Sequence, residues 1–324
     1  MGAGSWGLAV AALASQSADV RLVCRTPEQA QALAPERSDR RYLTQMRLPE
    51  AVTITHLGAE DALAGCHLVA LAVPSRSRQA VAEWLVPRLE PGVGICSLTK
   101  GLDPATGRRL GEVWAETLGA GHPICVLTGP NHAEEVAAGQ PTAAVVAGDL
   151  TLGERVQALL GGPRFRVYLN DDLIGVELAA AAKNVVALAA GMSDGLGYGD
   201  NAKASLVTRG LAEMTRLGVA YGGRDATFRG LAGMGDLVAT CTSRHSRNRR
   251  AGEMIAQGTP AADVEAALGQ VVEGLATVEN LLALAERAGV ELPISTEVSR
   301  AAFTGRPASE CVAALMARAP AAED

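Results

Sequence analysis

The stretch MGAGSWGLAVAALAS, residues 1–15, decides the fold of the first half of the chain. Gly2, Gly4 and Gly7 form the pattern G-x-G-x-x-G, and an alanine-rich helical pattern follows directly. In dinucleotide-binding α/β domains the first glycine makes a tight turn, the second lets the backbone approach a pyrophosphate, and the third allows close helix packing. The phosphates then lie at the helix N-terminus, where free N–H groups favour an anion. We therefore expect these three glycines to bind a dinucleotide.

A β-strand normally precedes this fingerprint, yet only Met1 stands before Gly2 in this sequence. That strand would lie in the middle of the sheet, and its absence would leave backbone groups of both neighbouring strands unpaired. Two explanations are open. Either the chain starts upstream of Met1, which is the preferred explanation, or the protein folds with a defective sheet.

The first half of the chain alternates between apolar runs and helical patterns. Continuous apolar runs are typical of parallel strands that are buried on both faces. They cover residues 20–24, 52–56, 67–75, 93–101, 124–130 and 142–148. The pattern predicts a doubly wound α/β domain of the Rossmann type over residues 1–171, with its first strand missing. Ligands of such sheets bind beyond the carboxyl ends of the strands, where Ser75, Lys100 and Gly129 are expected.

The residues that follow the run 20–24 indicate the kind of dinucleotide. An acidic side chain at this place would bind the ribose of NAD, but Arg25 and Thr26 follow, and the nearest acid is Glu28. An arginine here can bind a 2′-phosphate, which favours NADP(H) as the cofactor and leaves NAD(H) possible. The alternative interpretation is that Arg25 is a solvated side chain at a strand end.

From about residue 172 the chain changes to long helical patterns without intervening strands, which predicts an all-helical domain over residues 172–324. Its first helix is expected to end at Gly191, and the glycine-rich stretch that follows indicates tight turns or a close approach of the backbone. Lys183 stands in an almost wholly apolar part of this helix. Burial favours the neutral form of a lysine and so suits a general base, although a lysine at a rim can also reach water.

Lysine is rare in this chain, since 3 of the 29 basic residues are lysine and 29 − 3 = 26 are arginine. A lysine that persists against this bias is a candidate for a role that requires loss of a proton, which arginine cannot perform. The three are Lys100, Lys183 and Lys203. Asn184, beside Lys183, offers a neutral hydrogen-bond partner. For Lys203, in the first turn of a helix, we expect a structural role with Asp200 as a candidate partner.

A second dense motif, GLAGMGDLVATCTSRHSRNRRAGE, covers residues 230–253. Glycines flank Asp236, and four arginines then occur together with Ser246 and Asn248. The arginines are Arg244, Arg247, Arg249 and Arg250. Such a cluster can be a nucleic-acid patch, but no aromatic residues are interleaved and the net charge of the chain is 29 − 35 = −6. We therefore expect it to hold one phosphate monoester through bidentate hydrogen bonds.

The composition is that of a soluble globular protein, with 48% hydrophobic and 20% charged residues. No apolar run predicts a membrane span, and the N-terminus does not resemble a signal peptide. We therefore expect a cytoplasmic protein without a membrane or a nucleic acid as partner. The six cysteines form no C-x-x-C pair and no cluster with histidine, which predicts reduced thiols and no metal site.

Several motifs together resemble those of bacterial NAD(P)-dependent glycerol-3-phosphate dehydrogenases, and the resemblance covers the whole chain. In chain order they are GAGSWG, SLTKG, LTGPNHAEEV, KNVVALAAGMSDGLGYGDNAKASLVTRGLAEM, GMGDLVATC, SRNRR and VVEGLATVENL. The resemblance implies reversible hydride transfer between NAD(P)H and dihydroxyacetone phosphate, which yields sn-glycerol 3-phosphate for phospholipid synthesis. It also implies a Rossmann domain, a helical domain of the 6-phosphogluconate-dehydrogenase-like type, and a homodimer.

The resemblance implies roles for individual residues as well. Lys183 resembles the catalytic proton acceptor, and Lys100 resembles a lysine that contacts both cofactor and substrate. Further substrate contacts are implied for Gly129, Asn131, Asn184, Asp236, Ser246, Arg247 and Asn248. Further cofactor contacts are implied for Ser5, Trp6, Arg25, Ala133, Arg247, Val271 and Glu273. Many relatives carry Ser or Thr where Asn131 stands.

The chemistry of the residues agrees with this resemblance. Departure of a hydride from C2 makes the hydroxyl more acidic, so a base must take its proton, and a lysine suits that role. We expect Lys183 to be this base and Asp236 to orient it, while Lys100 polarises the developing oxygen or holds the phosphate. Two alternatives stay open: another dehydrogenase of the 6-phosphogluconate or 3-hydroxyacid type, and a nucleotide-binding protein that has lost catalysis.

Overall fold

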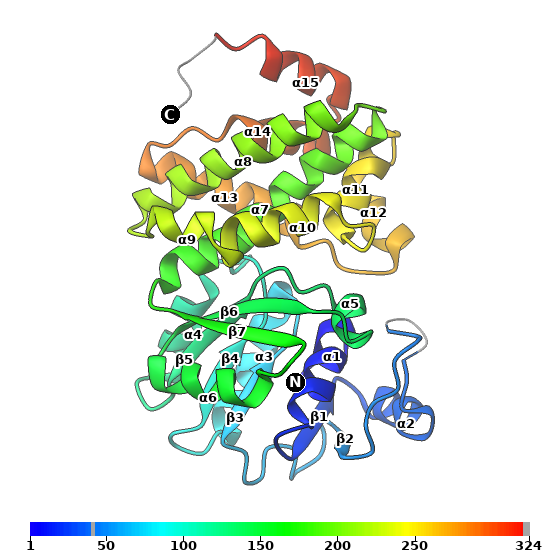
Figure 1. Cartoon of the computed structure of the whole chain (residues 1–324), viewed down its shortest axis with the longest axis vertical. Helices are drawn as coiled ribbons and strands as arrows, with labels where there is room; N and C mark the ends of the chain where they lie inside the picture. The colour runs from blue at the N-terminus through cyan, green and yellow to red at the C-terminus, as the bar shows by residue number, and fades with distance from the viewer. Residues whose placement is uncertain (40–42, 320–324) are drawn as a thin grey trace. The chain divides into compact units, whose positions relative to one another are not determined.

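The computed structural model describes residues 1–39 and 43–319, which form two compact units (Figure 1). The first unit contains Met1–Asp103 and Arg108–Glu177. The second contains Leu178–Asp324 together with the short segment Pro104–Gly107.

The first unit is built on parallel strands. A two-stranded parallel sheet pairs β1 (Val20–Cys24) with β2 (Val52–His56). A five-stranded sheet has the order β3-β4-β5-β6-β7. Its strands are β3 (Leu68–Leu71), β4 (Gly94–Ser97), β5 (Ile124–Thr128), β6 (Thr142–Gly148) and β7 (Phe165–Asn170). All six expected apolar runs contain a strand, but the expectation that all are parallel was wrong for β6, which pairs antiparallel with β5. The sequence analysis also missed β7, an edge strand with alternating burial.

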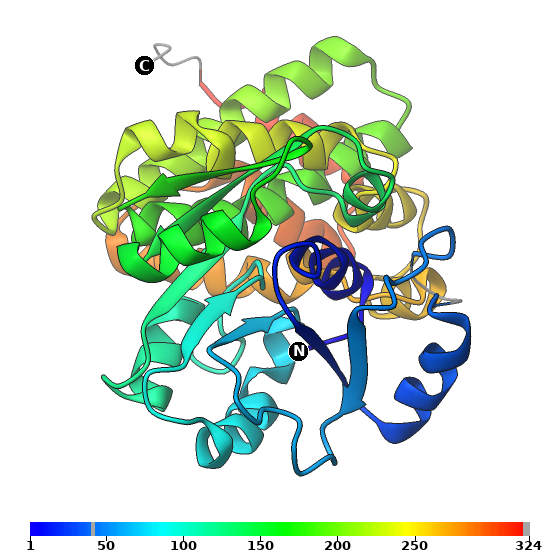
Figure 2. The ribbon, with the colours of Figure 1, turned by 60° about the horizontal axis from the view of Figure 1, so that its bottom comes forward.

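Met1 and Gly2 lie between β1 and β3, where a central strand is expected. The amino group of Met1 donates a hydrogen bond to Ala70 O at 2.7 Å, and Met1 O accepts one from Ala72 N at 2.9 Å. On the other side, Gly2 N donates to Val23 O at 3.0 Å. Met1 and Gly2 therefore occupy the place of the first strand, which was expected to be missing. The sheet is therefore divided at this place, near the N-terminus marked in Figure 2.

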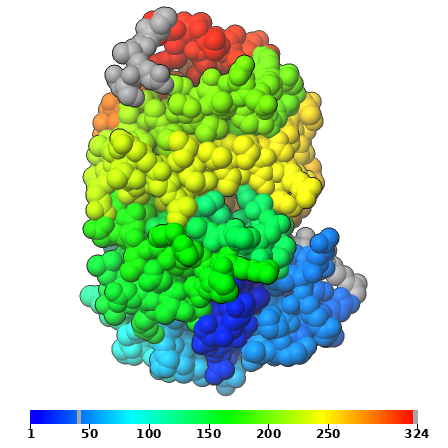
Figure 3. Space-filling view, in the orientation of Figure 1, coloured from blue at the N-terminus to red at the C-terminus, as the bar shows by residue number. Residues whose placement is uncertain are grey.

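Helices cover both faces of this sheet, as the doubly wound pattern predicts. They are α1 (Ser5–Ala14), α2 (Pro27–Glu36), α3 (Arg78–Leu85), α4 (Leu110–Leu118), α5 (Ala133–Ala137) and α6 (Leu150–Leu160), with short 3-10 turns at Ser75–Ser77 and Val86–Arg88. Neighbouring residues of β4 face opposite cores: Cys96 packs with α1 and α6, whereas Ile95 packs with α3 and α4. In Figure 3 the dark blue of α1 reaches the surface between the green of α6 and the lighter blue of α2 and β2.

The second unit is wholly helical among its described residues. Its helices are α7 (Leu173–Gly195, of which residues 173–177 belong to the first unit), α8 (Asp200–Ala220), α9 (Asp225–Arg229), α10 (Asp236–Thr242), α11 (Arg247–Ala256), α12 (Ala261–Leu268), α13 (Glu273–Ala288), α14 (Pro293–Phe303) and α15 (Ala308–Met316), with a π-helical turn at Leu231–Gly235. Among the described residues α7 is the one helix long and apolar enough to cross a membrane, but 89% of that stretch is buried in the protein. It is a core helix.

Helix α7 runs four residues beyond its expected end at Gly191. A Cβ atom at Gly191 would lie 1.8 Å from Arg249 O, and a Cβ at Gly252 would lie 2.0 Å from Leu188 O. The glycine at 191 therefore serves a backbone-to-backbone crossing of α7 and α11 and does not end the helix. At the start of α7, the carboxylate of Asp172 accepts a hydrogen bond from Gly175 N at 2.8 Å and so caps the helix.

A buried carboxylate in the second unit makes its stability depend on pH. Glu213 of α8 is 3% exposed and accepts hydrogen bonds from Ile294 N at 2.5 Å and Ser295 N at 3.3 Å, at the N-terminus of α14. Desolvation by burial raises the pKa of Glu213 to about 7, against the lowering effect of these hydrogen bonds. Between about pH 4.5 and 7, Glu213 keeps its proton in the folded state but has lost it in the unfolded state. The free energy of unfolding therefore falls as the pH rises through this range.

We expect this contribution to amount to about 3 kcal/mol between pH 5 and pH 8. Glu213→Gln, which cannot titrate, should flatten the pH dependence of the unfolding free energy by that amount. Urea unfolding at both pH values measures it, and Glu291→Gln, at a carboxylate side chain that is 80% exposed, is the control. Equal pH slopes for the wild type and Glu213→Gln would contradict the prediction.

Candidate active site

Lys183 lies in the core of the second unit, in contact with two polar side chains of α10. Its Nζ donates a hydrogen bond to Asp236 Oδ1 at 2.9 Å and another to Thr240 Oγ1 at 2.7 Å. Lys183 is 5% exposed and Asp236 is 2% exposed. The hydroxyl of Thr240 in turn donates to Asp236 O at 2.6 Å. Burial without partners would be costly for the ammonium group, and these contacts satisfy it and hold its position.

The sequence analysis paired Lys183 with Asp236 and missed Thr240. Thr240 follows Asp236 by four residues, so both side chains lie on one face of α10. That spacing was the available signal. In the motif GMGDLVATC it identifies the threonine as a neighbour of the aspartate, although it does not show that a lysine 57 residues away would reach it.

Two asparagines join three helices beside Lys183. Asn248 Nδ2 donates to Asn184 Oδ1 at 2.9 Å, and Asn248 Oδ1 accepts a hydrogen bond from Gly274 N at 2.9 Å. Both side chains are at least nine-tenths buried. This chain of amides holds the start of α11 and the first turn of α13 against α7. The predicted substrate residues Asn184, Asn248, Lys183 and Asp236 are thereby brought together within one unit.

The arginine cluster divides into exposed and internally bonded members. Ser246 caps α11 and accepts a hydrogen bond from Arg249 N at 3.2 Å. Arg247 is exposed at the first position of the helix. Arg249 is half-buried and forms ion pairs with Asp194 at 2.5 Å and with Glu253 at 2.6 Å. Arg249 is therefore part of the framework, and Arg247 is the member that stands at the helix N-terminus, where an anion is favoured.

The partner of Lys203 differs from the expected one. Its Nζ lies 2.7 Å from Asp194 Oδ1, and Asp194 belongs to the last turn of α7. Asp200, the candidate named from the sequence, is not the ion-pair partner. The helical extension of α7 past Gly191 explains the difference, because it carries Asp194 to the start of α8.

Lys100 is the centre of a second cluster, in the first unit. Its Nζ donates to Gly129 O at 3.0 Å and to Asn131 Oδ1 at 2.9 Å, beyond the carboxyl ends of β4 and β5. Lys100 and Gly129, both predicted for this sheet edge, are thus brought together with Asn131, which was predicted as a substrate contact. Asn131 is 7% exposed, and its Nδ2 has no hydrogen-bond partner among the described residues. A buried amide donor of this kind is available to a ligand oxygen or to an ordered water.

The glycine fingerprint has the shape that a dinucleotide requires. Gly2 has φ 94°, and a Cβ atom there would lie 2.4 Å from Ala72 O. A Cβ at Gly7 would lie 1.8 Å from Gly2 O, so packing alone excludes side chains at both positions. Around Gly4, by contrast, a Cβ would meet nothing within 4 Å, and Gly4 caps the N-terminus of α1. This open approach to free backbone N–H groups fits a phosphate.

The other residues predicted to bind the cofactor are divided between the two units. Ser5 and Trp6 form the first turn of α1, and the indole Nε1 of Trp6 is buried without a partner among the described residues. Ala133 starts α5, which packs on α1. Arg25 follows β1, and its backbone N donates to Gln29 Oε1 at 3.1 Å. Val271 and Glu273 precede and begin α13 in the second unit.

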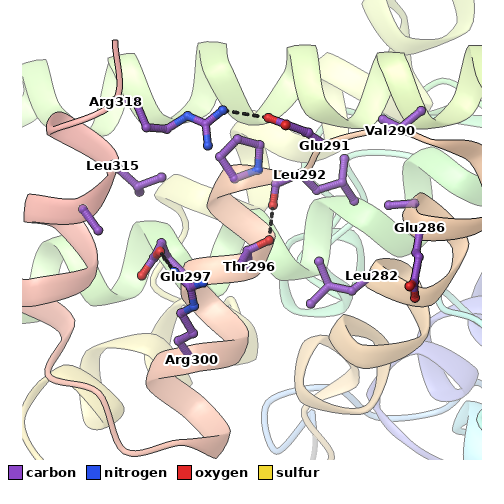
Figure 4. A pocket seen from close by; sticks show the side chains of 13 residues that line it. Leu282, Glu286, Val290, Glu291, Leu292, Thr296, Glu297, Arg300, Leu315 and Arg318 are labelled. Atoms are coloured by element: carbon purple, nitrogen blue, oxygen red, sulfur yellow. Dashed lines mark hydrogen bonds and ion pairs between the residues drawn. The ribbon is translucent and has the colours of Figure 1, made fainter.

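A cavity of about 400 Å³ lies elsewhere in the second unit, among α13, α14 and α15 (Figure 4). No residue predicted for the active site lines it. Four of the charged side chains that line it form ion pairs with one another, Arg318 with Glu291 at 2.8 Å and Arg300 with Glu297 at 2.5 Å, and Glu286 also lines it. These paired groups offer no chemistry for a reaction. No group of three or more metal-binding side chains occurs in residues 1–39 and 43–319, and the six cysteines are free thiols.

A Rossmann unit with a dinucleotide cradle and a helical unit with a buried, hydrogen-bonded lysine define the class of nicotinamide-dependent dehydrogenases. The family models named NAD-dependent glycerol-3-phosphate dehydrogenase N-terminus and C-terminus match residues 1–151 and 172–313. This chain belongs to that family, which confirms the resemblance seen in its motifs.

Similar proteins cover nearly the whole chain. The glycerol-3-phosphate dehydrogenase (NAD(P)+) of Thermus thermophilus is 49% identical over 326 residues, which cover 100% of this chain and 98% of that protein. The enzyme of the same name from Moorella thermoacetica is 46% identical over 320 residues, covering 98% and 95%. The crystal structure of glycerol-3-phosphate dehydrogenase from Coxiella burnetii superposes with a TM-score of 0.93 at 39% identity, covering 98% and 97%. The Rossmann and helical architecture is thereby confirmed.

Proposed function

We propose that this protein catalyses the reversible reduction of dihydroxyacetone phosphate to sn-glycerol 3-phosphate, which supplies phospholipid synthesis. The observation that carries the proposal is the buried contact of Lys183 with Asp236 and Thr240, in a chain that matches this enzyme family over nearly its whole length. A bound nicotinamide dinucleotide supplies the hydride that C2 of the substrate takes up.

Lys183 moves the proton in this reaction. In reduction its ammonium group donates a proton to the substrate oxygen as the C2 carbonyl becomes a hydroxyl, and in oxidation its amine takes that proton back. Asp236 and Thr240 hold Nζ of Lys183 in one position, so the lysine side chain does not have to change conformation before the proton is transferred. Asp236 also stabilises the charged form of Lys183, which precedes proton transfer in reduction and follows it in oxidation.

The remaining predicted residues bind and orient. In the second unit, Ser246, Arg247 and Asn248 at the N-terminus of α11 hold the phosphate, and Asn184 fixes Asn248. In the first unit, Lys100 contacts cofactor and substrate, while Gly129 and Asn131 hold its Nζ, and the free amide of Asn131 donates to a substrate oxygen. The dinucleotide residues are Gly2, Gly4, Ser5, Trp6, Gly7, Arg25 and Ala133, with Arg247, Val271 and Glu273 in the second unit.

The phosphate site is tested by Arg247→Ala. We expect the KM for dihydroxyacetone phosphate to rise at least about tenfold, because a charge-assisted contact to the phosphate is lost. Steady-state oxidation of NADPH measures it, with Arg229→Ala, in an exposed ion pair on α9, as the control. An unchanged KM would remove Arg247 from the phosphate site, and turnover of a 3-hydroxyacid in place of this substrate would contradict the proposed reaction.

NADP(H) is the proposed preferred cofactor, since Arg25 stands where an acid would otherwise bind the ribose of NAD. Arg25→Ala should raise the KM for NADPH by about tenfold and leave that for NADH within twofold, because only NADPH carries the 2′-phosphate. Equal effects on both cofactors would remove Arg25 from that role.

We also propose a cytoplasmic homodimer with a division between its two domains near residue 171.

A further inference from the structure

Asp194 connects two cations in the second unit. In the last turn of α7 its side chain is 13% exposed. Oδ1 lies 2.7 Å from Lys203 Nζ at the start of α8, and Oδ2 lies 2.5 Å from Arg249 Nη1 on α11. None of the roles argued so far for the reaction uses this carboxylate, and its ion pairs join the three helices α7, α8 and α11.

Arg249 extends this connection to the segment that precedes α11. Its Nε donates to Ser243 O at 3.1 Å, its Nη1 donates to Glu253 Oε1 at 2.6 Å, and its backbone N donates to Ser246 Oγ. One residue therefore binds the loop before the helix, the cap of the helix and the next turn of the helix. Asp194 ties this assembly to α7, beside the hydrogen bond from Asn248 to Asn184.

The crossing of α7 and α11 makes such a tie necessary. Gly191 and Gly252 bring the two backbones into direct contact, with room for no Cβ atom at either position. Interlocking side chains normally fix the register of two packed helices, and glycines provide none at the points where they stand. The ion pair from Asp194 to Arg249 supplies a directional contact beside this crossing, where the glycines have no side chains to interlock.

The cluster is also electrically balanced. Asp194 and Glu253 carry two negative charges, and Lys203 and Arg249 carry two positive charges. A lone carboxylate near the N-terminus of α11 would repel a phosphate, whereas a neutral cluster does not. Arg249 thus forms its ion pairs within the protein, and Arg247 is the arginine that is placed to bind the substrate phosphate.

We propose that Asp194 is a positioning residue for the phosphate site. Through Arg249 it holds the loop 243–246 and the start of α11, so that Ser246, Arg247 and Asn248 are presented together to the phosphate of the substrate. Lys203 completes the charge balance of Asp194. This inference rests on the proposed function, which places the substrate phosphate at those three residues.

Asp194→Asn tests the inference, because it keeps the shape of the side chain and removes its charge. We expect the KM for dihydroxyacetone phosphate and the Ki for inorganic phosphate to rise about tenfold, while kcat and the KM for NADPH change less than about threefold. Arg249→Lys, which keeps the charge but loses the fork that spans several acceptors, should raise the same KM. Asp225→Asn, at an exposed ion pair of α9, is the matched control.

The direction of the change separates positioning from simple electrostatics. Removal of a negative charge alone would lower the KM for a phosphate substrate, and removal of a purely structural contact would lower Tm without moving Ki. Either result in Asp194→Asn would overturn the inference. If Asp194→Asn does not fold, Arg249→Lys decides by the same criteria. If Arg247→Ala raises the KM and these variants do not, the inference fails alone; if none of them does, the proposed phosphate site fails.

Discussion

Lys183→Ala is expected to lower kcat by at least about a thousandfold, because proton transfer by a positioned group contributes on the order of 10²–10⁴ and the substitution also removes a held cation. Affinity for NADPH should stay within threefold, since the dinucleotide cradle lies in the first unit around Gly2, Gly4 and Gly7. Stopped-flow oxidation of NADPH with dihydroxyacetone phosphate measures the rate, and fluorescence titration measures the affinity.

Lys183→Arg separates the two contributions to this loss. Arginine keeps the positive charge near Asp236 but does not release a proton at neutral pH, so we expect this variant to be nearly as slow as the alanine variant. If Lys183→Arg retained more than a tenth of the wild-type kcat, the lysine would act by its charge and not as the proton donor.

Thr240→Val, which keeps the size of the side chain and removes one acceptor of the Lys183 ammonium group, should lower kcat by about tenfold.

Gly252→Ala is expected to destabilise the second unit by about 2–3 kcal/mol and to lower Tm by about 5–10 °C. A Cβ atom there would lie 2.0 Å from Leu188 O and 2.8 Å from Met192 N, and both are backbone atoms of a buried helix that cannot rotate away. The intrinsic preference of a helix for alanine over glycine, about 1 kcal/mol, acts in the opposite direction and is smaller.

Thermal and urea unfolding measure this effect. Gly121→Ala is the control, because a Cβ at that glycine would meet nothing within 4 Å. The displaced α11 should also weaken the hydrogen bond from Asn248 to Asn184, so the KM for dihydroxyacetone phosphate should rise in the folded variant. A Gly252→Ala variant as stable as the wild type would show that the crossing of α7 and α11 is not the tight contact described here.

Much of the first unit could be predicted from short stretches of sequence. Glycine spacing identified the dinucleotide turn, and apolar runs located six of the seven strands. The direction of β6 was predicted wrongly, because a continuous apolar run reflects burial of both faces, which is typical of parallel strands but also occurs in this antiparallel one. The edge strand β7 was missed because its exposed residues interrupt the apolar run.

In the second unit, likewise, some of the residues that pair with charged side chains were predicted from the sequence and others were not. Lys183 was identified from its apolar surroundings and Asp236 from its glycine-rich motif, and the pair was correctly expected. Thr240 and Asp194 were not, because each acts on a residue of another helix. Asp194 was hidden further by the assumption that Gly191 ends α7.

The sequence by itself determined what depends on neighbours along the chain: the fingerprint turn, the alternation of strands and helices, and the few lysines available for acid–base chemistry. These features follow from backbone conformation and side-chain periodicity within a few residues. Only the tertiary structure decided which charges pair. Lys183 meets Asp236 across 53 residues and Arg249 meets Asp194 across 55. The reason is physical: each pair joins two helices, α7 with α10 and α7 with α11, so it exists only once those helices have packed, and in the second case glycines let the two backbones meet.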